Sequence, residues 1–227
     1  MRRGLQYGWI LFFLGLTACG NVATLKTARV FEKDKSEEVV FTSVLVESEA
    51  APTLDADSLT VENLYITPGI MTVGGIGNDA DMTLKLTFPG AVQAEWRYQL
   101  FTAGGLAMSG GFGLGTDIVS AIGIFVDVFG DKDDTTYEDE YDSGWQMVCY
   151  EFFVPLYLSL DVSKEFSIYT SARYHLWGML GDFGFNLVNA TGGIRIGSDI
   201  AVLLEVGNSY DLFRKTNVLH AGVGVVF

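Results

Sequence analysis

Apolar and polar side chains alternate along most of this sequence, and the apolar positions of the alternation carry no charge. Between Cys149 and Asp161 the even positions are Tyr, Phe, Val, Leu, Leu and Leu, whereas the odd positions include a glutamate and a serine. A repeat of two places these two sets on opposite faces of a β-strand. The same alternation recurs in 82–88, 92–100, 165–177, 187–197 and 200–207. The pattern predicts an all-β protein whose antiparallel strands are joined by turns.

Eleven segments qualify as strands. Besides the strongly alternating ones, they are the Gly-rich segments 105–115 and 118–129, the apolar segments 39–47 and 65–76, and the terminal segment 217–227. The pattern does not assign an inward face to 39–47 or 65–76. A single-chain bacterial membrane barrel with both ends on one side needs an even number of strands. Ten or twelve strands are therefore expected, with one false segment or one missed near 49–63.

The polar faces of the strands indicate whether water or lipid surrounds the folded protein. They carry few charges, of both signs, although the whole chain has 28 acidic against 14 basic residues. A soluble sandwich or lipocalin would be expected to carry many more charges on its outer face. A small mixed set suits a confined interior, where buried charges must pair. The predicted lumen charge network consists of Lys85, Glu95, Arg97, Glu151, Arg173, Arg195 and Glu205.

The opposite faces are uninterrupted aliphatic and aromatic ladders, which hydrocarbon tolerates and water penalises. Beyond the N-terminus, no apolar run approaches the roughly 18 residues of a membrane helix, although the mean hydropathy is +0.29. Aromatic residues stand near strand ends, as in the interfacial girdles of membrane barrels. They are Tyr65, Phe88, Phe101, Phe129, Trp145, Trp177 and Phe227. The sequence therefore predicts an antiparallel transmembrane β-barrel of about 10–12 strands.

The first 18 residues have the layout of a secretory signal peptide, with Arg2 and Arg3 before an apolar stretch from Leu5 to Leu16. The sequence Leu-Thr-Ala-Cys that ends at Cys19 resembles the bacterial lipobox. This resemblance implies cleavage before Cys19 and a lipid on its thiol. Gly20 is compatible with sorting to the outer membrane, where the lipid would hold the N-terminus on the periplasmic side. The alternative is an ordinary signal peptide cleaved after Ala18.

Residues 19–38 are predicted to form the lipidated N-terminus and a polar tether, and residues 39–227 the barrel. The tether has no sustained period, and it holds every Lys and Arg between positions 19 and 84. It is interpreted as a spacer between the lipid and the folded domain. A short edge strand near Ala28–Phe31 is the alternative.

The last strand ends on the carboxyl-terminal residue of the chain, Phe227. Apolar residues alternate before it, so that one face carries Leu219, Ala221, Val223, Val225 and Phe227. Such an ending resembles that of bacterial outer-membrane β-barrel, porin-like proteins. The resemblance covers about 39–227 and implies recognition of this strand by the outer-membrane assembly machinery. If Phe227 lies on the periplasmic side, the turns at 161–164 and 197–199 lie there too, and the loops at 130–144, 178–184 and 208–216 face outward.

The sequence contains few candidate metal ligands or catalytic residues. The loop 130–144 holds seven acidic residues against one lysine, but its spacing lacks the ordered pattern of a calcium loop, so no metal or cofactor is expected and cation binding stays open. The two histidines, His175 and His220, have no nucleophile arrangement beside them, so we do not expect an enzyme, and each histidine is expected in a lumenal hydrogen-bond network. The net charge of −14 argues against nucleic acid as a partner.

The expected function is that of a lipid-anchored outer-membrane barrel, acting as a narrow porin-like pore or as a structural surface protein. The lumen charges could line a solute path or close the lumen by pairing across strands. A soluble, lipid-tethered periplasmic barrel that binds an apolar ligand is the alternative, and an outer-membrane lipid hydrolase is a weaker one. The outer-membrane lipid is an expected partner, whereas the sequence leaves the oligomeric state open.

Overall fold

Ten antiparallel strands make up the fold. The computed structural model describes residues 23–48, 64–88, 90–117, 149–179, 182–212 and 215–227. The strands are β1 (Ser36–Ser48), β2 (Leu64–Gly75), β3 (Ala80–Thr87), β4 (Ala91–Ala103), β5 (Leu106–Asp117), β6 (Cys149–Asp161), β7 (Phe166–Met179), β8 (Asp182–Gly197), β9 (Ala201–Asp211) and β10 (Asn217–Val226).

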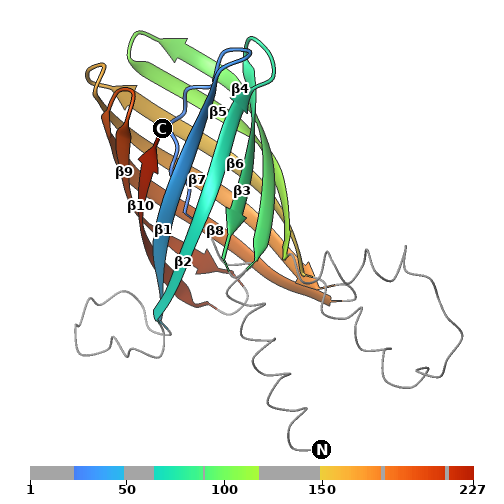
Figure 1. Ribbon diagram of the computed structural model, residues 1–227. Helices are drawn as coiled ribbons and strands as arrows, with labels where there is room; N and C mark the ends of the chain where they lie inside the picture. The colour runs from blue at the N-terminus through green and yellow to red at the C-terminus, as the bar shows by residue number, and fades with distance from the viewer. Residues whose placement is uncertain (1–22, 49–63, 89, 118–148, 180–181, 213–214) are drawn as a thin grey trace, which may run out of the picture.

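The strands form one closed ring, drawn in Figure 1. Each pairs with its neighbour in sequence, and β1 closes the ring by pairing with β10, where Val39 lies opposite Val226. Closure leaves no sheet edge unpaired, which a lipid-embedded sheet requires. The prediction of an antiparallel barrel of ten or twelve strands is confirmed, with ten strands. The eleventh candidate, 118–129, lies outside the described residues. Among the residues that are described, no helix is long and apolar enough to cross a membrane.

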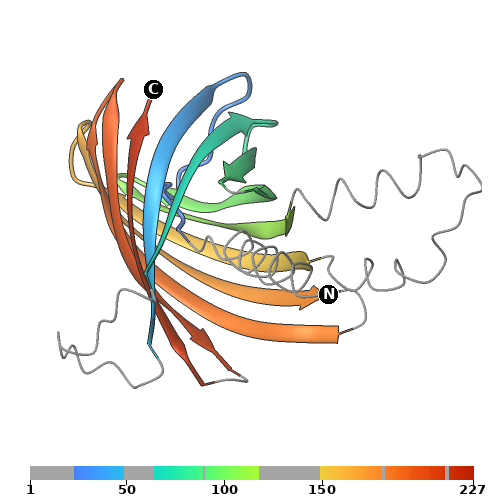
Figure 2. The same ribbon diagram turned by 60° about the horizontal axis from the view of Figure 1, so that its bottom comes forward.

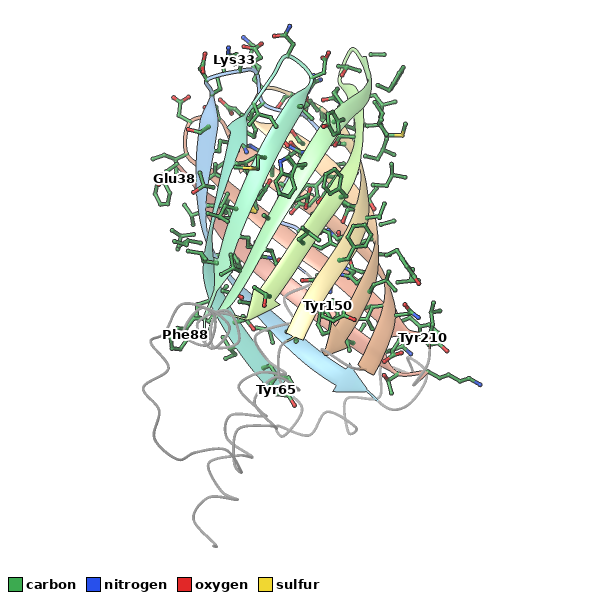
Figure 3. The ribbon with its side chains drawn as sticks, turned by 90° about the vertical axis from the view of Figure 1, so that its right-hand side faces the viewer. Lys33, Glu38, Tyr65, Phe88, Tyr150 and Tyr210 are labelled. Carbon is green, nitrogen blue, oxygen red and sulfur yellow. The ribbon has the colours of Figure 1, made fainter. Side chains whose placement is uncertain are left out.

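Apolar side chains cover the outside of the ring, and Figure 3 shows side chains projecting outward around it. In β6, for example, Val154, Leu156 and Leu158 are exposed, whereas Phe153, Tyr157 and Ser159 at alternate positions are buried. The alternation in the sequence therefore predicts the facing of this strand correctly. The burial pattern is inverted relative to a soluble barrel, because large apolar residues lie outside and charged residues lie inside.

The two ends of the barrel differ. The end that holds Phe227 also holds the connections 76–79, 104–105, 162–165 and 198–200, and we call it the short-turn end. At the other end lie Ser48 and Leu64, Thr87 and Ala91, Asp117 and Cys149, Met179 and Asp182, and Asp211 and Asn217, the strand ends that the remaining connections join. We call it the long-loop end. This grouping is the one that the sequence predicts for the 161–164, 197–199, 178–184 and 208–216 connections.

Several of the aromatic residues near the strand ends lie on the outside of the barrel. Phe88 at the long-loop end is 71% exposed, and Phe101 and Phe227 toward the other end are 46% and 61% exposed. Figure 3 shows Phe88 and Tyr65 at the opposite end of the barrel from Lys33. Phe129 and Trp145 of the predicted girdle lie outside the described residues. Exposed aromatic rings near both ends fit two membrane–water interfaces.

The structure differs from the predicted tether of residues 19–38. Residues 36–38 belong to β1, and residues 23–31 run inside the barrel, as Figure 2 shows in blue. We call residues 23–31 the lumen segment. An exposed turn at 32–35 joins it to β1. The lumen segment is not a strand of the ring, because residues 23–31 make no β-ladder pairing. Just after it, Lys33 forms a single parallel bridge with Gly75.

Candidate functional site

Side chains of the barrel wall hold the lumen segment through hydrogen bonds to its backbone. The amide NH groups of Thr24 and Leu25 donate to the two carboxylate oxygens of Glu205, at 2.6 and 2.7 Å. Three further amides donate to side-chain oxygens, which are Ala28 to Ser159, Val30 to Gln99 and Phe31 to Asp81. A backbone without regular secondary structure needs such partners when it is buried. The wall side chains therefore provide the hydrogen bonds that a β-ladder would otherwise supply.

Two basic residues of the wall bind carbonyl groups of the same segment. The Lys85 ammonium donates to the Ala23 carbonyl at 2.6 Å. The Arg97 guanidinium donates to the carbonyls of Thr27 and Arg29 and also to both oxygens of Asp81. Arg97 is 1% exposed. Asp81 thus balances the charge of Arg97, and the remaining NH groups of the guanidinium bind the backbone of the lumen segment.

A cluster of four side chains spans the lumen, and we call it the Glu95 cluster. Glu95 accepts from the Lys26 ammonium at 2.6 Å and from the Tyr157 hydroxyl at 2.9 Å. Arg173 donates to the Tyr157 hydroxyl at 2.7 Å and lies 3.5 Å from Glu95. Lys26 comes from the lumen segment, whereas the other three come from β4, β6 and β7. The cluster therefore ties the lumen segment to three strands on the wall.

One sector of the inner wall is apolar, and the lumen segment covers it. Val39 and Phe41 of β1, Met71 and Val73 of β2, and Leu203 of β9 are all buried inside the barrel. Ala23 and Leu25 of the lumen segment pack in the same cluster and are each 1% exposed. An apolar inner wall would be costly against water. The wall is thus complementary to this segment in apolar contacts as well as in charge.

A small cavity lies beside the lumen segment. A cavity next to Lys26, Lys85, Glu95 and Arg173 has room for about one water molecule. An eight-stranded barrel is just wide enough for side chains to fill it. With ten strands the interior is wider, and here the lumen segment occupies the additional width.

The structure places all seven residues of the predicted lumen charge network on the inner face. Glu95 and Arg173 share the Glu95 cluster, and Lys85, Arg97 and Glu205 each bind the backbone of the lumen segment. Glu151 lies 2.5 Å from His175 and accepts a hydrogen bond from the Gln93 amide at 2.5 Å. Arg195 pairs with Glu37 nearer the short-turn end, where both side chains are partly exposed.

The two histidines face the lumen and each lies beside a carboxylate. His175 Nδ1 bonds Glu151 at 2.5 Å, and His220 Nε2 lies 3.4 Å from Glu205 Oε1. Within the described residues, no group of three or more His, Cys, Asp or Glu could hold a metal ion. The acidic loop 130–144 and Cys19 lie outside these residues. The C-terminal residues Ala221, Val223 and Phe227 face outward and are exposed, and Leu219 and Val225 are partly exposed.

Lys26, Arg29 and Asp81 belong to the charge network of the lumen but were not predicted from the sequence. Lys26 and Arg29 were assigned to the tether, whereas they pair with Glu95 and Asp161. Asp81 was not assigned to either face. One signal was available, because the tether holds every basic residue between positions 19 and 84 of an acidic chain. Basic residues gathered next to an acidic barrel indicate a pairing partner inside the chain.

Comparisons with known proteins give distant structural similarity. No protein-family model matches the chain, and no curated protein matches its sequence. Among solved structures, the translocator domain of the autotransporter NalP from Neisseria meningitidis is similar at 8% identity and a TM-score of 0.44, covering 100% of this chain and 97% of that one. The KdgM porin has 8% identity and a TM-score of 0.40, covering 82% and 97%. Ail, the attachment invasion locus protein of Yersinia pestis, has 10% identity and a TM-score of 0.33, covering 87% and 100%.

Proposed function

We propose that this protein is an outer-membrane β-barrel whose lumen is closed by its own lumen segment, and that it serves as a structural surface protein. The observation that carries the proposal is the match between residues 23–31 and the inner wall. Five amides and three carbonyls of the segment bond wall side chains, and its apolar side chains cover an apolar sector. A segment bound this way closes the path that a porin leaves open.

The outward position of the apolar faces supports the membrane barrel over a soluble barrel. Ile66 and Val206 are each 65% exposed, and similar residues surround the ring. A contiguous apolar belt of this kind marks a surface that meets lipid or another partner. The cavity beside the lumen segment has room for about one water molecule, so it is too small for the apolar ligand of the alternative.

Reversing the charge of Lys26 is expected to open the barrel to ions. In planar bilayers the unaltered protein should give no conductance steps, because the lumen segment fills its interior. In the unaltered protein Glu95 accepts from the Lys26 ammonium at 2.6 Å. In Lys26→Glu a carboxylate would face Glu95 instead. Like charges in a confined interior repel strongly, so the segment should leave the lumen and discrete steps should appear. Arg29→Glu, opposite Asp161 at the partly exposed end of the segment, is a second variant with the same expected result.

Lys35→Glu is the matched control for both variants. Lys35 pairs with Glu32 in the exposed turn after the lumen segment, where its ammonium holds the pKa of Glu32 below its ordinary value. The same change of charge there should leave the barrel closed. All variants are first checked for the heat-dependent gel mobility of a folded barrel. Steady conductance steps from the unaltered protein would contradict closure and favour the narrow pore.

The lipid anchor at Cys19 is a separate part of the proposal. It is supported by the sequence Leu-Thr-Ala-Cys after an apolar stretch and a basic start. We expect a metabolically incorporated fatty acid to label the unaltered protein, and we expect Cys19→Ser to abolish this labelling. Equal labelling of both chains would contradict lipidation at this cysteine.

A further inference from the structure

The lumen segment runs in one direction, from the interior toward the short-turn end. Ala23 is bound by Lys85, two residues before the end of β3 at the long-loop end. Ala28 then bonds Ser159, two residues before β6 ends at the short-turn end, and Arg29 bonds Asp161 and the Gly104 carbonyl of the turn there. Figure 1 shows this segment inside the ring before β1 starts back toward the long-loop end.

The distance from Ala23 to Cys19 is short. Four residues span at most about 14 Å when fully extended. Lys85, which binds the Ala23 carbonyl, lies two residues from the long-loop end of β3. The four residues before Ala23 are therefore long enough to reach that end of the barrel. To reach the short-turn end instead, the chain before Ala23 would have to run back alongside the lumen segment. A chain returning toward that end would have to pass the buried residues Thr24, Leu25 and Lys26, which fill the interior with the wall.

We propose that the chain before Ala23 leaves the barrel at the long-loop end, so that a lipid on Cys19 inserts into the membrane leaflet on the long-loop side. This inference rests on the proposed function, since it requires the barrel to span a membrane. In an outer-membrane barrel the longer loops face the outside. The anchor then lies at the cell surface, in contrast to the periplasmic anchor that the lipobox alone suggests. The N-terminus and the external loops share one side, and the turn at 162–165 lies on the other.

Epitope accessibility on intact cells tests this arrangement. A short epitope is inserted after Gly20 in one chain, after Thr136 in the 118–148 connection in a second, and after Ser163 in the short-turn end in a third. We expect antibody to bind the first two on intact cells and the third only after the outer membrane is permeabilised. Asn21→Cys in a Cys149→Ser background, labelled with a membrane-impermeant maleimide, gives the same information without an insertion.

The possible results separate the two levels of the proposal. Should the Gly20 epitope become accessible only together with the Ser163 epitope, while the Thr136 epitope is accessible from the start, the surface position of the N-terminus is wrong. Should all three require permeabilisation, the membrane barrel itself is wrong. Labelling of Asn21→Cys on intact cells to the same extent as after permeabilisation supports the inference independently of antibody size.

Discussion

Replacing Arg97 by methionine is expected to lower the free energy of unfolding by about 3–5 kcal/mol, the usual cost of leaving one partner of a buried ion pair without the other. The side chains of Arg97 and Asp81 are 1% and 0% exposed. Methionine keeps much of the side-chain volume but removes every donor. Asp81 then loses its charge partner, and the carbonyls of Thr27 and Arg29 lose their donor. The change is measured as the urea unfolding midpoint of the refolded protein in lipid vesicles.

Two further chains make this result specific. Arg195→Met breaks an ion pair with Glu37 whose side chains are 17% and 23% exposed, so it should cost less than half as much. The double variant Asp81→Asn, Arg97→Met removes the orphaned charge and should recover part of the loss. If Arg97→Met were no more destabilising than Arg195→Met, the conclusion that Arg97 holds the lumen segment in place would be wrong.

Placing arginine at Leu156 is expected to destabilise the barrel by about 2–4 kcal/mol, the cost of a cation at the middle of a membrane-spanning strand. Leu156 lies near the centre of β6 and is 47% exposed on the outside. In water, an exposed leucine-to-arginine change costs within about 0.5 kcal/mol. The size of the effect therefore reports which solvent meets this face. Unfolding in vesicles of defined thickness provides the measurement.

Leu160→Arg is the matched control, because Leu160 is 46% exposed on the same face but one residue from the end of β6. There an arginine reaches the interface, and the cost should fall to about 0–1 kcal/mol. Equal and negligible costs at both positions would show that water surrounds β6.

The alternation of side chains was sufficient to predict the barrel and the facing of most strands. In β4, Gln93, Glu95 and Arg97 are buried and the residues between them are partly exposed, as their polarity requires. For β1 and β2 the facing could not be predicted, because both faces are apolar. The structure gives the reason, since Val39, Phe41 and Met71 face inward against Ala23 and Leu25.

The lumen segment could not be predicted from periodicity, because it forms no ladder and has no repeat. Its position depends on pairings with residues far away in the sequence, such as Thr24 with Glu205 and Lys26 with Glu95. Residue polarity identified the wall charges but not their partners. For the same reason Glu37, Asp81 and Asp161 were not anticipated as partners of Arg195, Arg97 and Arg29.

Spin-label accessibility in lipid vesicles tests most directly whether hydrocarbon surrounds the barrel. In chains without native cysteines, a nitroxide is placed at the outward positions Val154, Leu156 and Leu158, and at the buried inward positions Ser159 and Ser171. Outward labels should collide often with oxygen, which concentrates in lipid, and rarely with a water-soluble nickel complex, whereas inward labels should be shielded from both. Frequent collisions of the nickel complex with the outward labels would contradict a membrane-spanning barrel.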